Sequence, residues 1–307
     1  MLARLQQSMI FSALLGAALW LAFSWARSPA LAVAGLLVVA CGHALVLALE
    51  FAAAHWLNRR DPAPRAGAWA LLRAWLAEVR VAPRVFLWQQ PFRSQALPDL
   101  LAPDAVLPGR RGIVFIHGFV CNRGYWNPWL RRLRGSGHAY AAVTLEPLFG
   151  SIDDYVPAIE AAVQRVTAAT GLAPLLVCHS MGGLAARAWL RAHQADARVH
   201  HVVTIGTPHH GTRLASFSPA INGQQMKWHS AWLQQLARDE PAQRSRLFTC
   251  YHSNCDNIVF PASVATLAGA DNRLVPGVPH VAFGFEPRVM RETLARAGEE
   301  TALLFPA

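Results

Sequence analysis

Residues 174–190, PLLVCHSMGGLAARAWL, join a short apolar run directly to a stretch with helical spacing. The run PLLVC is apolar and branched enough for a buried strand, and the following residues place Leu184, Trp189 and Leu190 near one helix face. Ser180 therefore lies where a strand becomes a helix. A sharp turn of this kind lifts a hydroxyl above the sheet edge, beside the free amides that open the helix. The corner suits a nucleophile, and the alternative is a helix-capping serine, because serine is a favoured N-cap.

The neighbours of Ser180 match the G-x-S-x-G pattern of such a nucleophile only in part. Gly182 keeps bulk away from the hydroxyl, but Cys178 stands where the first glycine is usual. A cysteine side chain is small enough for the turn to form. The pattern alone therefore does not decide between a nucleophile and a cap, and other positions must.

Composition indicates a membrane part in addition to a globular part. Of the 307 residues, 53% are hydrophobic and only 15% are charged, which is unusual for a wholly soluble domain. The formal net charge of +10 comes mostly from arginines that are scattered along the chain, without the clustering of a nucleic-acid motif. We expect affinity for a membrane surface, with neither a nucleic-acid nor a protein partner. Five widely spaced cysteines argue against a disulfide framework.

Two uncharged stretches, 9–26 and 30–49, are each long enough to cross about 30 Å of hydrocarbon. Only Arg27 lies between them, whereas several arginines follow the second stretch, so the positive-inside rule places both ends in the cytoplasm. We expect residues 1–57 to form a transmembrane hairpin with the remaining chain in the cytoplasm. The alternative is a signal peptide cleaved after the SWA motif at 24–26, but the second stretch would still hold the protein in the membrane.

The second stretch carries two ionisable residues, His43 and Glu50, seven positions apart on one helical face. Ionisable groups at membrane depth suggest a functional role by default. Bridging to the partner helix is the commoner use of such groups, and it is the preferred interpretation here.

Residues 58–80 begin as a linker rich in proline and arginine and continue as an amphipathic helix with tryptophans, suited to a membrane surface or to packing on the domain. The globular domain is expected over residues 81–307. Within it, strand-like runs alternate with helical patterns, which predicts an α/β fold with a mostly parallel sheet flanked by helices. The predicted strands are 112–116, 140–145, 174–178, 199–206 and 246–252.

Residues 211–242 carry several large apolar side chains but lie outside this alternation. An apolar flap over Ser180 would hold an acyl chain and exclude water, so this segment is predicted to be a lid. A surface helix packed on the sheet explains the same residues equally well.

Functional groups of a parallel sheet gather at the carboxyl ends of its strands. Asp256 follows the strand 246–252, His280 lies in a later loop, and the chain order Ser, Asp, His is the one that this topology requires. His280 would take the proton of Ser180, and Asp256 would hold the imidazole in its tautomer. The backbone N–H groups of Phe119 and Met181 would stabilise the oxyanion.

Two other assignments compete with the predicted triad and its neighbours. Asp271 is a second candidate acid, but it lies just before a strand rather than after one. Cys250, His252 and Cys255 suggest a zinc site, yet no fourth ligand stands at a suitable spacing. We therefore expect neither a metal nor another cofactor, and we interpret the two cysteines as small packed residues.

Five motifs together resemble the bacterial lipase and esterase branch of the α/β-hydrolase family, which includes triacylglycerol lipases. The resemblance spans about residue 112 to the C-terminus and is carried by FIHGF 115–119, CHSMGGL 178–184, TIGTPHHGT 204–212, CDNIVFP 255–261 and GVPH 277–280. It implies the α/β-hydrolase fold, with Phe119 and Met181 forming the oxyanion hole. It also implies that His117 shapes the oxyanion loop, in which Gly118 allows a tight turn. We interpret His179 as a structural or wall residue rather than a base.

These features predict a membrane-anchored serine esterase or lipase of the bacterial inner membrane, acting on lipid-like acyl esters through an acyl-enzyme on Ser180. Two alternatives remain open. The same serine would serve an acyltransferase or a thioesterase, and the domain would also be compatible with a catalytically silent binding module at the membrane.

Overall fold

The computed structural model describes residues 1–298, so the last nine residues of the predicted domain 81–307 lie outside the described part. Its centre is a six-stranded sheet in the order β2-β1-β3-β4-β5-β6, and every neighbouring pair is parallel. The strands are β1 Ile113–Ile116, β2 Tyr140–Ala142, β3 Leu175–His179, β4 His201–Ile205, β5 Phe248–His252 and β6 Asp271–Leu274. The predicted α/β fold with a parallel sheet flanked by helices is confirmed.

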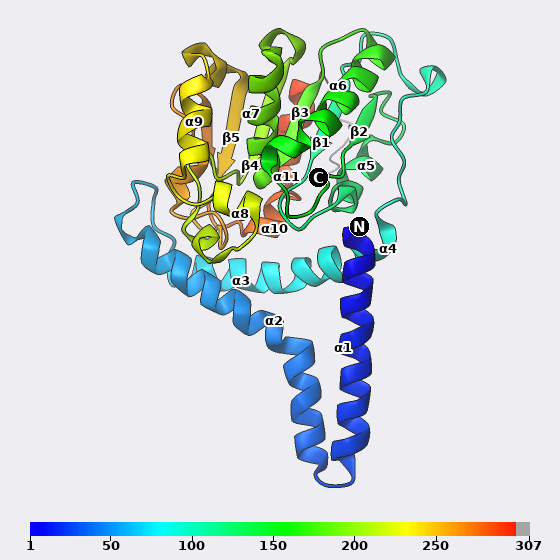
Figure 1. The fold of residues 1–307 in the computed structure, drawn as a ribbon, viewed down its shortest axis with the longest axis vertical. Helices are drawn as coiled ribbons and strands as arrows, with labels where there is room; N and C mark the ends of the chain where they lie inside the picture. Colours follow the sequence, from blue (N-terminus) through cyan, green and yellow to red (C-terminus); the bar gives the residue numbers. More distant parts are fainter. Residues whose placement is uncertain (299–307) are drawn as a thin grey trace.

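Helices cover both faces of the sheet (Figure 1). Alternate residues of β1 point to opposite sides, as the two-residue period of a strand requires. The domain helices are α5 Asn127–Leu133, α6 Val156–Thr170, α7 Met181–His193, α8 Ile221–Gln225, α9 Ala231–Asp239, α10 His280–Phe283 and α11 Pro287–Arg296. Val114 and Ile116 join a hydrophobic cluster with α6 and α7, whereas Ile113 and Phe115 join a second cluster with α5 and α11.

One strand is shorter than predicted, and a sixth strand, β6, is not among the five predicted ones. The strand predicted at 140–145 ends at Ala142, and the next residues run on beside the carboxyl end of β1, where the Val143 N–H donates to the carbonyl oxygen of Phe115. The edge strand β6 carries Asp271 and Arg273, and its residues are exposed or half-buried. Charged side chains on an edge discourage pairing with another chain, so this strand lacks the apolar run by which the buried strands were predicted.

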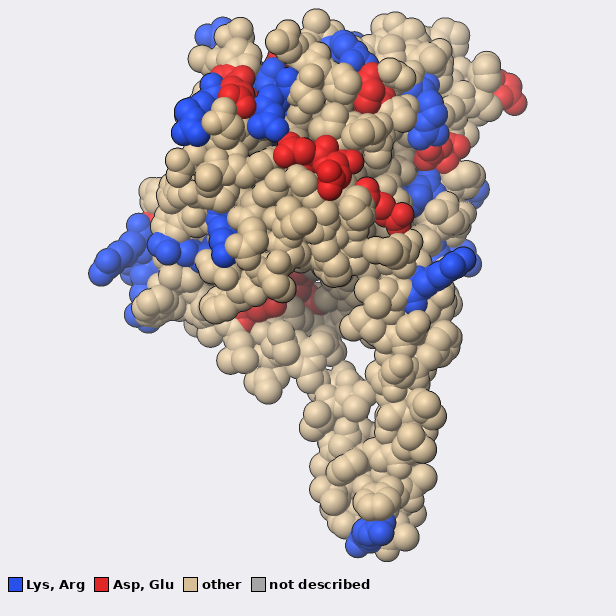
Figure 2. Space-filling model, in the orientation of Figure 1, with Lys and Arg blue, Asp and Glu red and all other residues tan. Residues whose placement is uncertain are grey.

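The N-terminal helices α1 Leu2–Trp25 and α2 Pro29–Leu57 form a hairpin. Figure 1 shows α1 and the first half of α2 side by side, projecting away from the domain, while the second half of α2 bends beneath it. Both helices are long and apolar enough to cross a membrane. In Figure 2 the projecting part carries basic side chains only at its tip, and Arg27 is the only Lys or Arg between Arg4 and Arg59.

The helix α3 Ala68–Pro83 lies across the base of the domain, at the side from which the hairpin projects (Figure 1). It continues without a break through a helical turn at Arg84–Gln89 into α4 Gln90–Arg93. The predicted border between residues 80 and 81 therefore falls within a helix. Because α3 packs against α10 as well as α2, it belongs structurally to both parts of the chain.

The segment predicted as a lid contains one 3₁₀ turn, Arg213–Phe217, followed by α8 and α9. Its far end is held by an ion pair between Arg187 of α7 and Glu240, with Nη2–Oε2 and Nε–Oε1 distances of 2.6 and 2.9 Å. Arg187 is only 2% exposed. A bidentate pair in so buried a position fixes the end of the segment to the sheet-covering helix.

Candidate active site

Ser180 joins β3 to α7 with a backbone conformation that non-glycine residues rarely adopt, φ 53° and ψ −129°. Close packing holds this turn. A Cβ on Gly118 would lie 2.7 Å from the Cβ of Ser180, and a Cβ on Gly182 would lie 2.3 Å from the carbonyl oxygen of Ile116. The Ser180 side chain makes no capping hydrogen bond to α7. Its geometry therefore favours the interpretation as a nucleophile over the alternative of a helix cap.

The structure brings Ser180, His280 and Asp256 together. Ser180 Oγ lies 3.0 Å from His280 Nε2, and His280 Nδ1 lies 2.9 Å from Asp256 Oδ2. The other carboxylate oxygen, Oδ1, accepts the N–H groups of Ile258 and Val259. Asp256 is thus fixed as an acceptor, which places the imidazole proton on Nδ1 and leaves the Nε2 lone pair for the serine hydroxyl.

The environment of His280 tunes its basicity. Burial alone would lower the pKa of the imidazole, but the attraction and hydrogen bond of Asp256 outweigh burial, and the pKa is raised above its ordinary value. A raised pKa strengthens His280 as a base once it is neutral, and it also extends the acidic range in which the ring is protonated and inactive.

The loop after β1 is fixed by His117. Its Nε2 accepts the N–H of Leu145 at 3.0 Å, so its Nδ1 carries the proton and donates to the carbonyl oxygen of Gly118 at 2.9 Å. In a trans peptide the N–H points opposite to the preceding carbonyl, so this bond fixes the direction of the Phe119 N–H. Burial lowers the pKa of His117 to about 4, which keeps this tautomer neutral near pH 7.

The two predicted oxyanion donors belong to residues near the serine. Phe119 and Ser180 line the same cleft. Met181 is the first residue of α7, where a backbone N–H has no partner within the helix. Beside Phe119, Val120 has φ 51°, a strained conformation for a β-branched residue and one of the features that cluster at functional sites.

His179 supports the site rather than acting in it. Its Nε2–H donates to the carbonyl oxygen of His280 at 2.9 Å, and its ring stacks on Tyr125 with the centroids 4.5 Å apart. The Tyr125 hydroxyl in turn donates to the carbonyl oxygen of Val281. Burial lowers the pKa of His179 well below its usual range, so the ring stays neutral.

The competing assignments are not brought to the site. Asp271 lies on the edge strand and pairs with Arg273 and Arg296. Cys250 packs in the cluster beneath α7, whereas Cys255 packs against Phe51 and Ala74 in a different cluster. Within residues 1–298, no three His, Cys, Asp or Glu side chains gather as a metal site would require.

Sequence reasoning missed three residues at the site. Gly206 has φ +58°, and a Cβ there would lie 2.9 Å from Asp256 Oδ2. Asn257 accepts the His280 N–H, and Glu78 of α3 accepts two N–H groups of α10. The available signals were a glycine directly after a strand, and a single acidic residue between Asp61 and Asp99 within an otherwise apolar and basic stretch.

A cleft of about 270 Å³ opens beside Ser180. Its walls are mainly apolar and come largely from the segment predicted as a lid, with further contributions from the loops after β1 and Asp256. They include Phe119, Leu214, Phe217, Met226, Ile258 and Val259. Phe217 is 86% exposed, so a large apolar side chain meets solvent at the cleft.

Comparison with known proteins places this chain among hydrolases of one family. Residues 113–302 match the model of the alpha/beta hydrolase family. A triacylglycerol lipase of Burkholderia plantarii is 32% identical over 159 residues, which make up 45% of this chain and 43% of that relative. The match thus spans less than half the length of the relative.

Two solved lipases share the fold. The mature lipase BlEst2 of Bacillus licheniformis superposes with a TM-score of 0.55 at 18% identity, over 62% of this chain and 94% of its own. Lipase B of Aspergillus fumigatus gives 0.51 at 14% identity, over 62% and 53% of the two chains. At these identities the likeness establishes the architecture alone.

Proposed function

Because the chain belongs to the α/β-hydrolase family, we propose that it is a membrane-anchored serine esterase of the lipase type, which hydrolyses lipid-like acyl esters through an acyl-enzyme on Ser180. The observation that carries the proposal is the contact of Ser180 Oγ with His280 Nε2 at 3.0 Å, continued from His280 to Asp256 at 2.9 Å. A hydroxyl, an imidazole and a carboxylate in this order form an acyl-transfer site.

Each step follows from this arrangement. His280 Nε2 takes the proton of the hydroxyl as Ser180 Oγ attacks the ester carbonyl, and the N–H groups of Phe119 and Met181 stabilise the oxyanion. His280 then gives the proton to the leaving alcohol, which leaves an acyl-enzyme. Water, activated by the same imidazole, attacks the acyl carbon and releases the carboxylic acid.

The apolar cleft supports an acyl chain as the group bound beside the serine. Its walls are mainly hydrocarbon and aromatic, and a pocket of this kind gains free energy by removing apolar ligand surface from water. The triacylglycerol lipase relative points to the same substrate class.

The hairpin supports anchoring in a bacterial inner membrane with the catalytic domain in the cytoplasm. Arg27 is the only charged residue at the tip, whereas several arginines lie at the domain end. The first helix also contacts the domain, since Leu2 is buried and the Gln6 side chain donates to Gln90. Cleavage after residue 26 would remove these contacts, so they favour a retained hairpin over a signal peptide.

The test is Ser180→Ala in the full-length protein, purified in detergent. The wild type should hydrolyse p-nitrophenyl acyl esters and react covalently with a fluorophosphonate, and the variant should do neither. Hydrolysis that persists in the variant would refute the proposal, and a folded wild type that resists the fluorophosphonate would indicate a silent binding module. Product analysis with added alcohols and thioesters separates hydrolysis from acyl transfer.

A further inference from the structure

Two acidic residues, one on α2 and one on α3, contact the loops that carry Asp256 and His280. The first is Glu78 of α3, whose side chain is fully buried. Its Oε1 accepts the N–H of Val281 at 2.7 Å and its Oε2 accepts the N–H of Ala282 at 3.1 Å. These two residues directly follow His280 at the start of α10, so the carboxylate holds the backbone that carries the imidazole.

The second acidic residue is Glu50, near the end of α2. Its Oε2 accepts a hydrogen bond from Asn257 Nδ2 at 2.8 Å. The amide oxygen of Asn257 accepts the N–H of His280 at 3.2 Å. Because Asn257 also follows Asp256 directly in the chain, Glu50 orients a side chain that links the turn containing Asp256 to the backbone of His280. The expectation that Glu50 bridges to the partner helix of the hairpin is therefore not what the structure shows.

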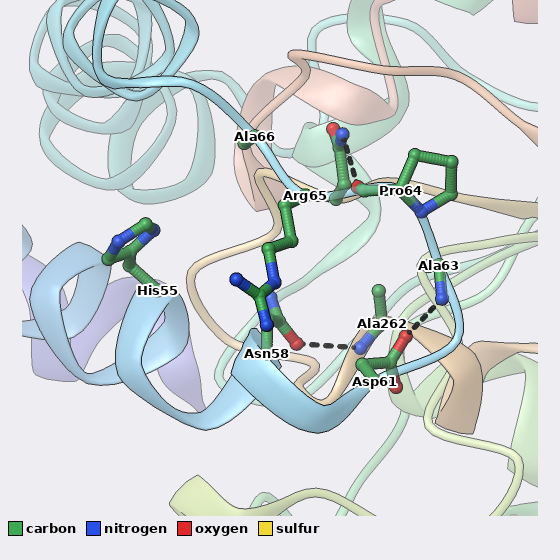
Figure 3. Close-up of a pocket in the computed structure, with 9 residues that line it drawn as sticks. His55, Asn58, Asp61, Ala63, Pro64, Arg65, Ala66 and Ala262 are labelled. Atoms are coloured by element: carbon green, nitrogen blue, oxygen red, sulfur yellow. Dashed lines mark hydrogen bonds between the residues drawn. The ribbon is translucent and has the colours of Figure 1, made fainter.

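The connection between α2 and α3 is bound to the same region (Figure 3). Asn58 Oδ1 accepts the N–H of Ala262 at 3.0 Å, and the carbonyl oxygen of Pro64 accepts a hydrogen bond from Asn254 Nδ2 at 2.9 Å. Asn254 and Ala262 stand on either side of Asp256 in the chain. The hairpin, the segment between α2 and α3, and α3 itself thus contact the loop that contains Asp256, and these contacts lie at both ends of that loop.

We propose that Glu78 and Glu50 are positioning residues for His280, so that the hairpin and α3 complete the active site instead of only tethering it. This inference rests on the proposed serine mechanism. The two carboxylates act in two ways: they fix the backbone on both sides of the imidazole, and they add negative charge that favours the imidazolium formed when His280 takes the serine proton.

The charged groups near His280 are carboxylates. Besides Asp256, Glu50 and Glu78, the titratable groups near it are His179 and, behind that ring, Tyr125. Burial holds the pKa of His179 well below and that of Tyr125 well above their usual ranges, so both stay neutral near pH 7. Burial also raises the pKa of Glu78 to about 7, so its charge develops as the pH rises through neutrality.

The test is Glu78→Gln in the full-length protein. Glutamine has nearly the same size, keeps one acceptor and removes the charge. Removing a nearby anion makes His280 easier to deprotonate, so the acidic limb of kcat/KM should move to lower pH by about 0.5 to 1 unit. The rate of fluorophosphonate labelling should show the same shift. At pH 8 we expect kcat to fall about 10-fold with little change in KM.

Glu50→Gln provides the second variant, because glutamine can still accept the bond from Asn257 while lacking the charge. It should shift the acidic limb in the same direction, and the double variant should shift it further. Glu286→Gln is the matched control. Glu286 also accepts a backbone N–H, that of Arg288 at the start of α11, and its replacement should leave both the rate and the pH profile unchanged.

The outcomes separate this inference from the proposed function. If Ser180→Ala keeps its activity, the serine mechanism itself is wrong. If Ser180→Ala is inactive while Glu78→Gln and Glu50→Gln have the pH profile of Glu286→Gln, the positioning role is wrong and the mechanism stands. Melting in the same detergent verifies folding, and Glu50→Gln decides the question if Glu78→Gln does not fold.

Discussion

Ser180 pays a backbone cost of order 1–3 kcal/mol for its positive φ, and the surrounding glycines make that conformation possible. Cys178, which replaces the usual first glycine, is fully buried and packs in the cluster beneath α7. Its small side chain thus occupies core space and does not crowd the serine, which explains why the departure from the motif is tolerated.

At the same scale, Gly206→Ala should impair the acid–base pair. Gly206 has φ +58°, and an added Cβ would lie 2.9 Å from Asp256 Oδ2 and 3.4 Å from His280 Nδ1. We expect kcat/KM to fall by at least about 10-fold, because small displacements of catalytic groups are costly. Gly171→Ala is the control, since Gly171 has φ +69° with nothing within 4 Å of an added Cβ.

Both alanine variants should lose about 1 kcal/mol of stability from the positive φ. Only the first should lose activity when kcat/KM is measured with a p-nitrophenyl ester. Equal activities in the two variants would mean that the space beside Asp256 is not critical.

The candidate triad could be predicted from the sequence because strand ends and chain order are local signals. Asp256 and His280 each follow an apolar run or a turn that can be recognised in the sequence. Glu78 could not be assigned in this way. Its role depends on α3 crossing beneath α10, and no periodicity within residues 68–83 reports which distant backbone a buried carboxylate will meet.

At the scale of elements, α3 shows why a helix boundary is hard to predict. The sequence predicts that residues 58–80 include a helix that lies on a membrane surface or on the domain, and the structure shows a helix with one buried face and one exposed face. Ala74 and Glu78 are buried, whereas Trp69 is 69% exposed. The helix continues past residue 80 because Pro83 begins a wider helical turn instead of ending the helix.

The apolar side chains of segment 211–242 lead to a prediction about how activity depends on the length of the substrate's acyl chain. Phe217→Ser should lower kcat/KM about 5- to 10-fold for a dodecanoyl ester, because an aromatic contact with the distal acyl chain contributes on the order of 1 kcal/mol. A butanoyl ester is too short to reach it and should change less than about 2-fold.

The matched control for this variant is Leu107→Ser. Leu107 is 53% exposed and bonds to Gly137, at the amino-terminal end of the sheet, opposite to Ser180. The Leu107→Ser variant should keep the wild-type kcat/KM for both esters. A uniform loss for both esters in Phe217→Ser would contradict a role in binding the acyl chain.

At the scale of the whole molecule, buried neutral histidines couple folding to pH. Burial lowers the pKa of His117 from 6.5 to about 4, and it lowers the pKa of His179 and His209 well below the usual range. Between the lowered pKa values of the folded chain and the ordinary histidine pKa of about 6.5, the unfolded chain binds more protons than the folded one. The free energy of unfolding therefore falls as the pH drops below about 6.5. For His117 alone, the loss in the free energy of unfolding is about 3 kcal/mol by pH 4. His280, whose pKa is raised, acts in the opposite direction.

We therefore expect Tm, followed by tryptophan fluorescence in detergent, to fall between pH 7 and pH 5. The carboxylate Glu160, whose pKa is lowered to about 2 mainly by Arg198, contributes only at lower pH. Within the window, Glu78, whose pKa burial raises to about 7, opposes the histidines, which outnumber it. His209→Gln should flatten the dependence. A pH dependence of Tm that is the same in His209→Gln as in the wild type would contradict the neutral state of His209.

The five cysteines differ sharply in accessibility: Cys121, Cys178, Cys250 and Cys255 are buried, and Cys41 on α2 is exposed. A folded chain thus offers a single thiol to reagents, and that thiol lies in the middle of the hairpin. In sealed vesicles the acyl chains of the bilayer would cover it, so a polar maleimide should modify Cys41 only after the vesicles are dissolved in SDS. Rapid modification of Cys41 in intact vesicles would show instead that the hairpin is exposed to water. The reactivity of this one thiol therefore reports how deeply the hairpin is immersed in the bilayer.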